Sequence, residues 1–260
     1  MIKAPAEVIW SPQPNPAARL RLLCFPYAGS GASVFRSWDL GADIEVSAIQ
    51  LPGREWRRDE LPITRMDALV DDLLPVVSEW LDDPRPVLFF GYSMGAALSY
   101  ALTTKLQQAG ARLPGALFVA ACRAPQLLAQ NTSVGHLNDK DFTDVIRRFG
   151  GMPDTILAEP ELLQLALPVL RADFEVLGTY QWQHHVPLNC PLTVYGGSED
   201  PHATRTELAQ WRGLTTSDFQ LRIFSGGHFF INDARAQLLK TLAADIAPLS
   251  AISKKALPMH

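Results

Sequence analysis

The stretch that most clearly suggests chemistry is Gly91-Tyr92-Ser93-Met94-Gly95, a G-x-S-x-G pattern. It follows the apolar run 87–90 directly and precedes small residues typical of a helix. A strand-to-helix turn this tight strains the serine backbone and exposes its Oγ, and only small neighbours permit the close approach. The helix behind it would direct N–H groups and its positive dipole end at the reacting centre. The pattern predicts that Ser93 is a nucleophile, and the alternative is a serine in a glycine-rich turn.

A serine hydroxyl is a weak nucleophile without a general base, and the best candidate for that base is His228. In folds with this motif the partners follow in the chain order serine, acid, histidine. Of the six histidines, His228 lies in the stretch 225–230, directly after the last predicted strand. That position puts it at the same edge of the sheet as Ser93. We therefore predict a catalytic role for His228, with a structural role as the alternative, and a solvated or lid-surface role for His184 and His185.

The acid that orients the histidine should end the preceding strand. Glu199 and Asp200 lie there, a few residues after the apolar run 192–195. Asp200 precedes Pro201, which biases its backbone toward an extended conformation. We predict that Asp200 orients the imidazole and stabilises the imidazolium, with Glu199 as the alternative.

A developing oxyanion needs two preorganised backbone donors. One is the N–H of Met94, the residue after the nucleophile. The other should come from the small-residue loop 26–31 that follows the first predicted strand. We predict the N–H of Ala28, with Tyr27 as the alternative. The loop does not fit a phosphate-binding loop because no Lys-Ser or Lys-Thr pair follows its glycines.

These residues require a sheet whose strands all end at one edge. Apolar runs predict strands at 20–25, 44–51, 87–90, 116–122, 192–195 and 219–224, and helical spacing predicts helices at 64–77, 94–108 and 232–246. Thr64 and Asp67 form a capping signature, and Pro75 should kink or divide its helix. The proline-rich residues 1–18 predict an irregular lead-in. Alternating strands and helices are typical of a mostly parallel α/β sheet flanked by helices.

One stretch, 124–186, breaks this alternation. It contains no strand pattern and predicts helices at 141–149 and 160–180. Helical insertions of this length between core strands often form a lid over a site. We expect a single domain over residues 1–260 with a helical lid at about 124–186. The alternative is an ordinary pair of helices that cover the sheet.

The composition excludes several other classes of protein. Apolar residues make up 47% of the 260 residues and charged residues 19%, which excludes a disordered chain. A net charge of −4 disfavours a nucleic-acid binder. No apolar run reaches the roughly 18 residues of a membrane span, and the first sixteen residues do not resemble a signal peptide. We expect a cytoplasmic protein that does not bind membranes.

The three cysteines, Cys24, Cys122 and Cys190, stand far apart and form no C-x-x-C pair. Each lies in or beside an apolar run, so we predict three small buried side chains with no chemical role. The absence of a disulfide framework fits a reducing compartment. Metal-ligand spacing is also absent, and the predicted chemistry needs no metal or redox cofactor.

Several motifs together resemble the stand-alone type II thioesterases that edit polyketide and nonribosomal peptide synthesis. They span roughly residues 20 to 245, which makes them far more specific than the serine motif alone. The matching stretches are Phe25-Pro26-Tyr27-Ala28-Gly29, Leu51-Pro52-Gly53-Arg54-Glu55, Gly91-Tyr92-Ser93-Met94-Gly95, Leu167-Pro168-Val169-Leu170-Arg171-Ala172-Asp173-Phe174 and Gly226-Gly227-His228-Phe229.

The resemblance implies an α/β-hydrolase fold and hydrolysis of acyl thioesters on the phosphopantetheine arm of acyl or peptidyl carrier proteins. Such enzymes remove aberrant or stalled acyl units from a synthase. Ser93, Asp200 and His228 carry over as the catalytic triad, and Ala28 and Met94 as oxyanion donors. The stretches around Arg54 and Asp173 carry over as family features only, with these two residues as a structural pair. We expect a monomer.

Four other functions use the same residues or the same fold. A chain-terminating, medium-chain acyl-carrier-protein thioesterase and a general small-ester hydrolase would both use the same triad. A terminal cyclase domain cut from a synthase is disfavoured because the chain opens with its own methionine and has no carrier domain. A non-catalytic binding module would keep the fold without the activity, and the intact serine, acid and histidine set disfavours it.

Overall fold

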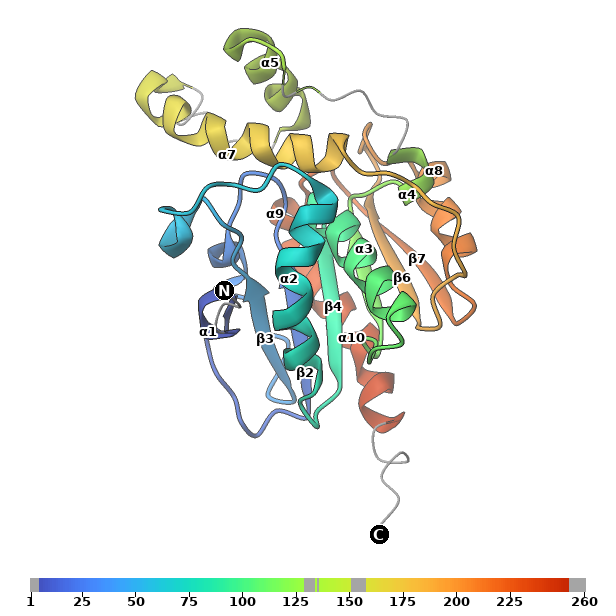
Figure 1. The fold of residues 1–260 in the computed structure, drawn as a ribbon. Coiled ribbons are helices and arrows are strands. Elements are labelled where there is room, and N and C mark those ends of the chain that lie inside the picture. The colour runs from blue at the N-terminus through green and yellow to red at the C-terminus, as the bar shows by residue number, and fades with distance from the viewer. Residues whose placement is uncertain (1–4, 129–133, 135, 151–157, 253–260) are drawn as a thin grey trace.

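A seven-stranded sheet with the order β1-β3-β2-β4-β5-β6-β7 forms the centre of the fold (Figure 1). The computed structural model describes residues 5–128, 134, 136–150 and 158–252. Only β1 is antiparallel to its neighbour. The strands are β1 Ile9–Trp10, β2 Leu20–Phe25, β3 Ile44–Ile49, β4 Val87–Tyr92, β5 Leu117–Ala120, β6 Leu192–Gly197 and β7 Phe219–Phe224.

The central strands β4 and β5 are apolar along their whole length because helices cover both faces of the sheet. All six residues of β4 are buried, whereas the edge strand β7 alternates between exposed and half-buried residues until it reaches Phe224. In the register, Leu22 of β2 lies between Val46 of β3 and Leu88 of β4. The six strands predicted from apolar runs are therefore confirmed.

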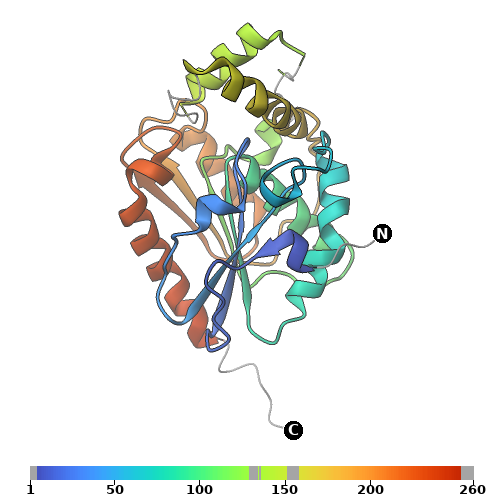
Figure 2. The ribbon, with the colours of Figure 1, turned by 90° about the vertical axis from the view of Figure 1, so that its left-hand side faces the viewer.

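Long helices pack on opposite faces of the sheet. Helices α2 (Met66–Leu81) and α3 (Met94–Gln108) share a core with Leu23 and Phe25 of β2. Helix α10 (Arg235–Ile252) shares a second core with Leu22 and Cys24, whose side chains point to the other face. Figure 2 shows α2 in cyan on one side of the sheet and α10 in red on the other. The two faces of one strand thus divide its side chains between two cores.

Short elements connect this framework. Helix α8 begins with a capping box in which Thr204 and Glu207 satisfy each other's backbone N–H groups. The short elements are α1 Pro5–Val8, η1 Ala32–Phe35, η2 Glu55–Arg57, α4 Pro125–Leu128, α8 Arg205–Ala209, η3 Gln210–Leu214 and α9 Phe230–Asp233.

Two local predictions were wrong, and of the third, that Pro75 kinks or divides its helix, the division is contradicted. The proline-rich lead-in contains α1 and β1, because β1 pairs with β3. Helix α2 has Arg65 rather than Thr64 at its N-cap, and the N–H of Met66 donates to the Thr179 Oγ1 at 3.1 Å. Pro75 does not divide α2, because buried side chains on both sides of the proline hold the helix against α3. Tertiary contacts thus outweigh the local signals.

Two helices from the stretch between β5 and β6 lie across the carboxyl ends of the strands. They are α5 (Asp139–Phe149) and α7 (Pro160–Gly178), at the top of Figures 1 and 2. Their own small core contains Phe142, Ile146 and Leu170. Both predicted helices are confirmed to within two residues, while 129–133, 135 and 151–157 lie outside the described residues.

The three cysteines are buried as predicted. Burial raises the pKa of Cys122 and of Cys190 to about 12, so both thiols stay protonated. None of the helices in the described ranges combines the length and the apolar character needed to cross a bilayer.

Candidate active site

Ser93 occupies the sharp turn between β4 and α3. Its backbone has φ 51° and ψ −113°, a conformation that side-chain-bearing residues rarely adopt. A Cβ on Gly91 would collide with the carbonyl of Gly95, and a Cβ on Gly95 would collide with the carbonyl of Phe25. Both glycines of the motif are therefore needed for the helix to pack this closely on the strands.

Three side chains that are distant in sequence meet at the carboxyl edge of the sheet. The Oγ of Ser93 lies 3.0 Å from Nε2 of His228, and Nδ1 of His228 lies 2.8 Å from Oδ2 of Asp200. Ser93 follows β4, Asp200 follows β6 and His228 follows β7, so the parallel strands deliver all three to one edge. A carboxylate at Nδ1 holds the proton there, which leaves Nε2 free to accept the serine proton.

Asp200 is buried, whereas its neighbour Glu199 is exposed. Burial alone would raise the pKa of Asp200, but the hydrogen bond and charge of His228 outweigh this and lower it. The second carboxylate oxygen accepts the backbone N–H of His202 at 2.8 Å. The structure therefore brings Asp200, and not Glu199, to the imidazole.

Tyr92, the residue before the serine, fixes the position of the histidine. Its buried hydroxyl donates to the carbonyl of His228 at 2.6 Å and accepts the N–H of Ile231 at 3.2 Å. Burial raises the pKa of Tyr92 well above its usual range, so the hydroxyl remains a donor. Sequence reasoning missed this contact. The only available signal was a tyrosine at the variable position of the serine motif.

The two predicted oxyanion donors come from two different elements, the start of α3 and the loop after β2. Met94 is the first residue of α3, where a helix N–H has no partner within the helix. Ala28 belongs to the loop after β2, and its N–H donates to no acceptor in the described part of the chain. A turn in which Ser30 donates to the carbonyl of Tyr27 shapes that loop.

Comparison with known proteins identifies the family. A family model described as a thioesterase domain matches residues 20–246. The chain belongs to the thioesterase family. It is 36% identical over 234 residues to the gramicidin S biosynthesis protein GrsT of Aneurinibacillus migulanus, covering 89% of this chain and 91% of that protein. It is 37% identical over 222 residues to thioesterase PikA5 of Streptomyces venezuelae, covering 85% and 78%.

Solved structures resemble this thioesterase over most of its length. RedJ, a thioesterase of the prodiginine pathway in Streptomyces coelicolor, superposes with a TM-score of 0.81 at 38% identity, covering 90% of this chain and 89% of that one. BorB, the type II thioesterase of the borrelidin cluster, gives 0.81 at 33% identity, covering 91% and 96%. The predicted α/β-hydrolase fold and the resemblance to type II thioesterases are confirmed.

A cavity of about 350 Å³ lies directly beside Ser93 and His228 in this thioesterase. Its lining is mostly apolar, and six of the lining residues come from α5 and α7. These are Ile146, Phe149, Ala166, Leu170, Phe174 and Leu177. Residues 27–31, Ser33, Val34 and Glu55 form another part of the wall. A chamber of this kind suits an acyl chain attached to a carbonyl at Ser93.

Sequence reasoning also missed a contact between α5 and the candidate catalytic residues. Phe149, the last residue of α5, stacks on His202 with ring centroids 3.8 Å apart and meets His228 edge-on at 5.3 Å. Burial, with a smaller contribution from the charge of His228, lowers the pKa of His202, which favours the neutral ring in this stack. Within the described ranges, no cluster of His, Cys, Asp and Glu is arranged to hold a metal ion.

Proposed function

We propose that this thioesterase hydrolyses acyl thioesters on the phosphopantetheine arm of acyl or peptidyl carrier proteins. By this activity it would remove aberrant or stalled acyl units from a polyketide or nonribosomal peptide synthase. The observation that carries the proposal is the hydrogen-bonded series Ser93, His228 and Asp200 beside an apolar cavity. The relatives support the pathway, since GrsT is named for gramicidin S biosynthesis and BorB as a type II thioesterase.

In the proposed mechanism, His228 takes the proton of Ser93 as Oγ attacks the thioester carbonyl carbon. The N–H groups of Ala28 and Met94 stabilise the negative oxygen of the tetrahedral intermediate. As the C–S bond breaks, His228 gives its proton to the leaving thiolate, and an acyl-serine remains. A water molecule then attacks this ester while His228 removes its proton, and the acid leaves as Ser93 regains a proton. Asp200 stabilises each imidazolium.

We propose that the stretch of about 124–186 is a lid within a single domain of residues 1–260. The contributions of α5 and α7 to the cavity wall support this role, because lifting them would open the chamber. Each chemical step uses side chains, backbone groups and water, so we propose an enzyme that acts without a cofactor. We further propose a cytoplasmic monomer whose partners are carrier proteins.

The test is hydrolysis of a chain-length series of acyl groups loaded on a carrier protein, with acyl-CoA and simple esters alongside. Ser93→Ala should lower kcat by about 10⁴-fold or more. The matched control is Ser198→Ala, because Ser198 is exposed at the same edge of the sheet. A preference for free esters over carrier-bound thioesters would contradict the editing role. A preference for medium chains would favour the chain-terminating alternative. A folded enzyme whose Ser93 resists a fluorophosphonate would favour the binding module.

A further inference from the structure

The stretches 51–55 and 167–174, which have no assigned role so far, contact each other next to the loop that contains Ala28. Arg54 precedes η2, and Asp173 lies on α7, 119 residues later. The guanidinium binds both carboxylate oxygens, with Nη1 2.5 Å from Oδ2 and Nη2 2.8 Å from Oδ1. The two side chains are only 8% and 2% exposed. Neither lines the cavity, so neither contacts the acyl chain.

This ion pair binds the main chain directly after Ala28. The Oδ2 of Asp173 accepts the N–H of Gly29 at 2.7 Å, and Nη1 of Arg54 donates to the carbonyl of Ser30 at 3.2 Å. Gly29 has φ 78°, and a Cβ there would collide with the side chain of Leu170 on α7. The conformation of the loop beside Ala28 is therefore set by contacts to the lid helix.

Two further side chains hold the remainder of the loop. The Oε1 of Gln50 accepts the N–H of Ala32 at 2.9 Å, and the carboxylate of Glu55 accepts the hydroxyl of Ser33 at 2.5 Å. Glu55 itself has a left-handed backbone, with φ 49°, at a position where strain persists only if its surroundings impose it. The loop after β2 thus depends on the 50–55 stretch and on α7 for its backbone hydrogen bonds.

We propose that Arg54 and Asp173 are positioning residues for the oxyanion hole. By holding Gly29 and Ser30, they fix the peptide after Ala28, so that the N–H of Ala28 faces the thioester oxygen only while α7 is seated on the cavity. This inference rests on the proposed function. It assigns a role to both stretches, and it makes the oxyanion hole depend on contact with the lid.

The chemistry of the pair fits this role. A carboxylate is a stronger acceptor for the N–H of Gly29 than a neutral oxygen. An unpaired negative charge beside the oxyanion hole would oppose the charge that forms on the substrate. Arg54 cancels that charge while it binds the loop carbonyl of Ser30. The pair therefore provides a strong anchor with little net charge.

The decisive variant is Arg54→Met/Asp173→Leu, which removes both charges together and so avoids an unpaired buried ion. Its kcat should fall by about 10- to 100-fold with KM within about 3-fold, because the loss is confined to the transition state. Its affinity for an alkyl boronic acid, whose boron replaces the carbonyl carbon and forms a tetrahedral adduct with the Oγ of Ser93, should fall by the same factor. Affinity for an unreactive thioether analogue of the substrate should stay unchanged.

Arg171→Met is the matched control. Arg171 lies two residues from Asp173 on α7, but it binds Asp139 and the carbonyl of Leu137 instead of the loop. Its kcat and boronate affinity should remain within about 2-fold of the wild type. Arg54→Lys keeps the charge but loses the two-point contact, and it should give a smaller loss than the double variant. If the double variant does not fold, Arg54→Lys decides the question by the same two measurements.

Wild-type hydrolysis of the carrier-bound thioester tests the proposed function, and the variant-to-wild-type ratio of boronate affinity tests the positioning. The two can fail separately because boronate binding needs the serine and the loop but no carrier protein. A folded double variant with wild-type kcat and boronate affinity would overturn the inference. So would a loss that is confined to thermal stability and KM.

Discussion

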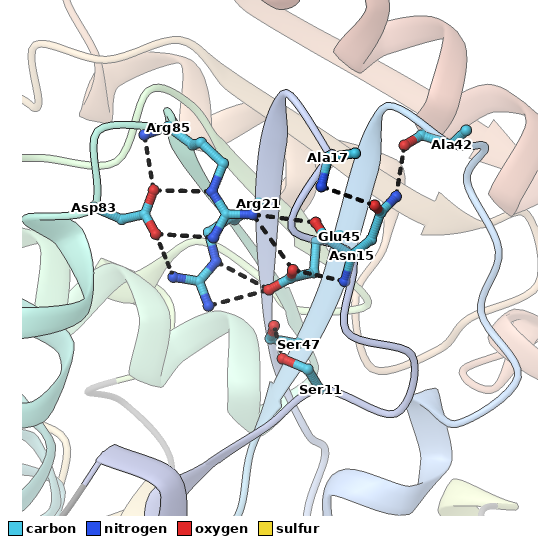
Figure 3. A network of polar contacts seen from close by, with 9 residues as sticks. All are labelled: Ser11, Asn15, Ala17, Arg21, Ala42, Glu45, Ser47, Asp83 and Arg85. Carbon is cyan, nitrogen blue, oxygen red and sulfur yellow. Dashed lines mark hydrogen bonds and ion pairs between the residues drawn. The ribbon is translucent and has the colours of Figure 1, made fainter.

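Among the buried or partly buried ion pairs of the described residues, two sets lie at opposite ends of the parallel strands. The pair of Arg54 and Asp173, which we call the upper pair, lies at the carboxyl ends and binds a loop of the candidate active site. The second set, which we call the lower network, lies at the amino ends (Figure 3). It consists of Arg21, Glu45, Asp83 and Arg85.

The four side chains of the lower network bind mainly one another. Arg21 joins the Glu45 and Asp83 carboxylates at 3.1 and 3.0 Å, and Arg85 joins the same two at 3.4 and 2.9 Å. Glu45 also accepts the backbone N–H of Asn15 at 3.0 Å, as Figure 3 shows. These contacts fix the beginnings of β2 and β3 and the turn before β4. None of the four residues lines the cavity beside Ser93.

Similar ion pairs therefore have different effects at the two ends of one sheet. Ligands of open α/β sheets bind outside the carboxyl ends of the strands, so only a network there can act on the chemistry. The amino ends, where the strands begin and the helices end, lie away from the ligand site. A network there can therefore act only on stability. Effects on kcat and effects on the free energy of unfolding should therefore be separable by experiment.

The largest effect is expected for Arg54→Met alone. It leaves the Asp173 carboxylate buried without its partner, which should lower the free energy of unfolding by about 3–5 kcal/mol. The same charge would oppose the oxyanion, so kcat should fall by about 10²- to 10³-fold, further than in the double variant. Urea unfolding and kcat, measured on the same preparation, check both numbers. A stability loss with wild-type kcat would make the upper pair equivalent to the lower network.

Glu45→Gln tests the lower network with the opposite pattern. The change removes the charge shared by Arg21 and Arg85, and the free energy of unfolding should fall by about 2–3 kcal/mol. The kcat of the folded enzyme should stay within about 2-fold of the wild type, because the site lies at the other end of the strands. Urea unfolding and steady-state kinetics test this. A kcat loss above 10-fold would show coupling through the length of the sheet.

Much of this arrangement follows from local sequence pattern. The apolar run before Ser93, the glycines around it and the chain order of Asp200 and His228 were sufficient to predict which side chains meet. Each signal spans a few residues and concerns one strand end, where backbone geometry leaves little choice. The strand pattern also predicted the parallel sheet, because apolar runs of this kind are buried on both faces.

The missed features are contacts between residues far apart in the chain. The bond from Gly29 to Asp173 spans 144 residues, and the stack of Phe149 on His202 depends on where the end of α5 docks. No periodicity encodes such contacts, because they follow from the packing of one element on another. The missed N-cap of α2 has the same cause, since the N–H of Met66 finds its acceptor on Thr179.

The pH dependence of stability provides a smaller test of the lower network. The hydrogen bond from Arg85, opposed in part by burial, lowers the pKa of Asp83 to about 2. An unfolded aspartate titrates near pH 3.9. The stabilisation is therefore complete above about pH 4 and is lost as the pH falls to about 2. With allowance for solvent screening it amounts to about 1 kcal/mol. Urea unfolding of the wild type and Asp83→Asn from pH 6 to pH 2 should give a difference that shrinks over this window. A constant difference would contradict it.

The smallest effect is expected for Glu55→Gln, at the far end of the loop that the upper pair holds. Ser33 lies five residues beyond Ala28, and a glutamine oxygen can still accept its hydroxyl. Only the extra strength of the charged acceptor is lost, so kcat should fall by about 2- to 5-fold. Asp173→Asn, which weakens the anchor next to Ala28, should cost more than 10-fold in the same assay. If the two variants lose equal activity, the loop moves as one rigid unit, and distance from Ala28 does not determine the effect of an anchor.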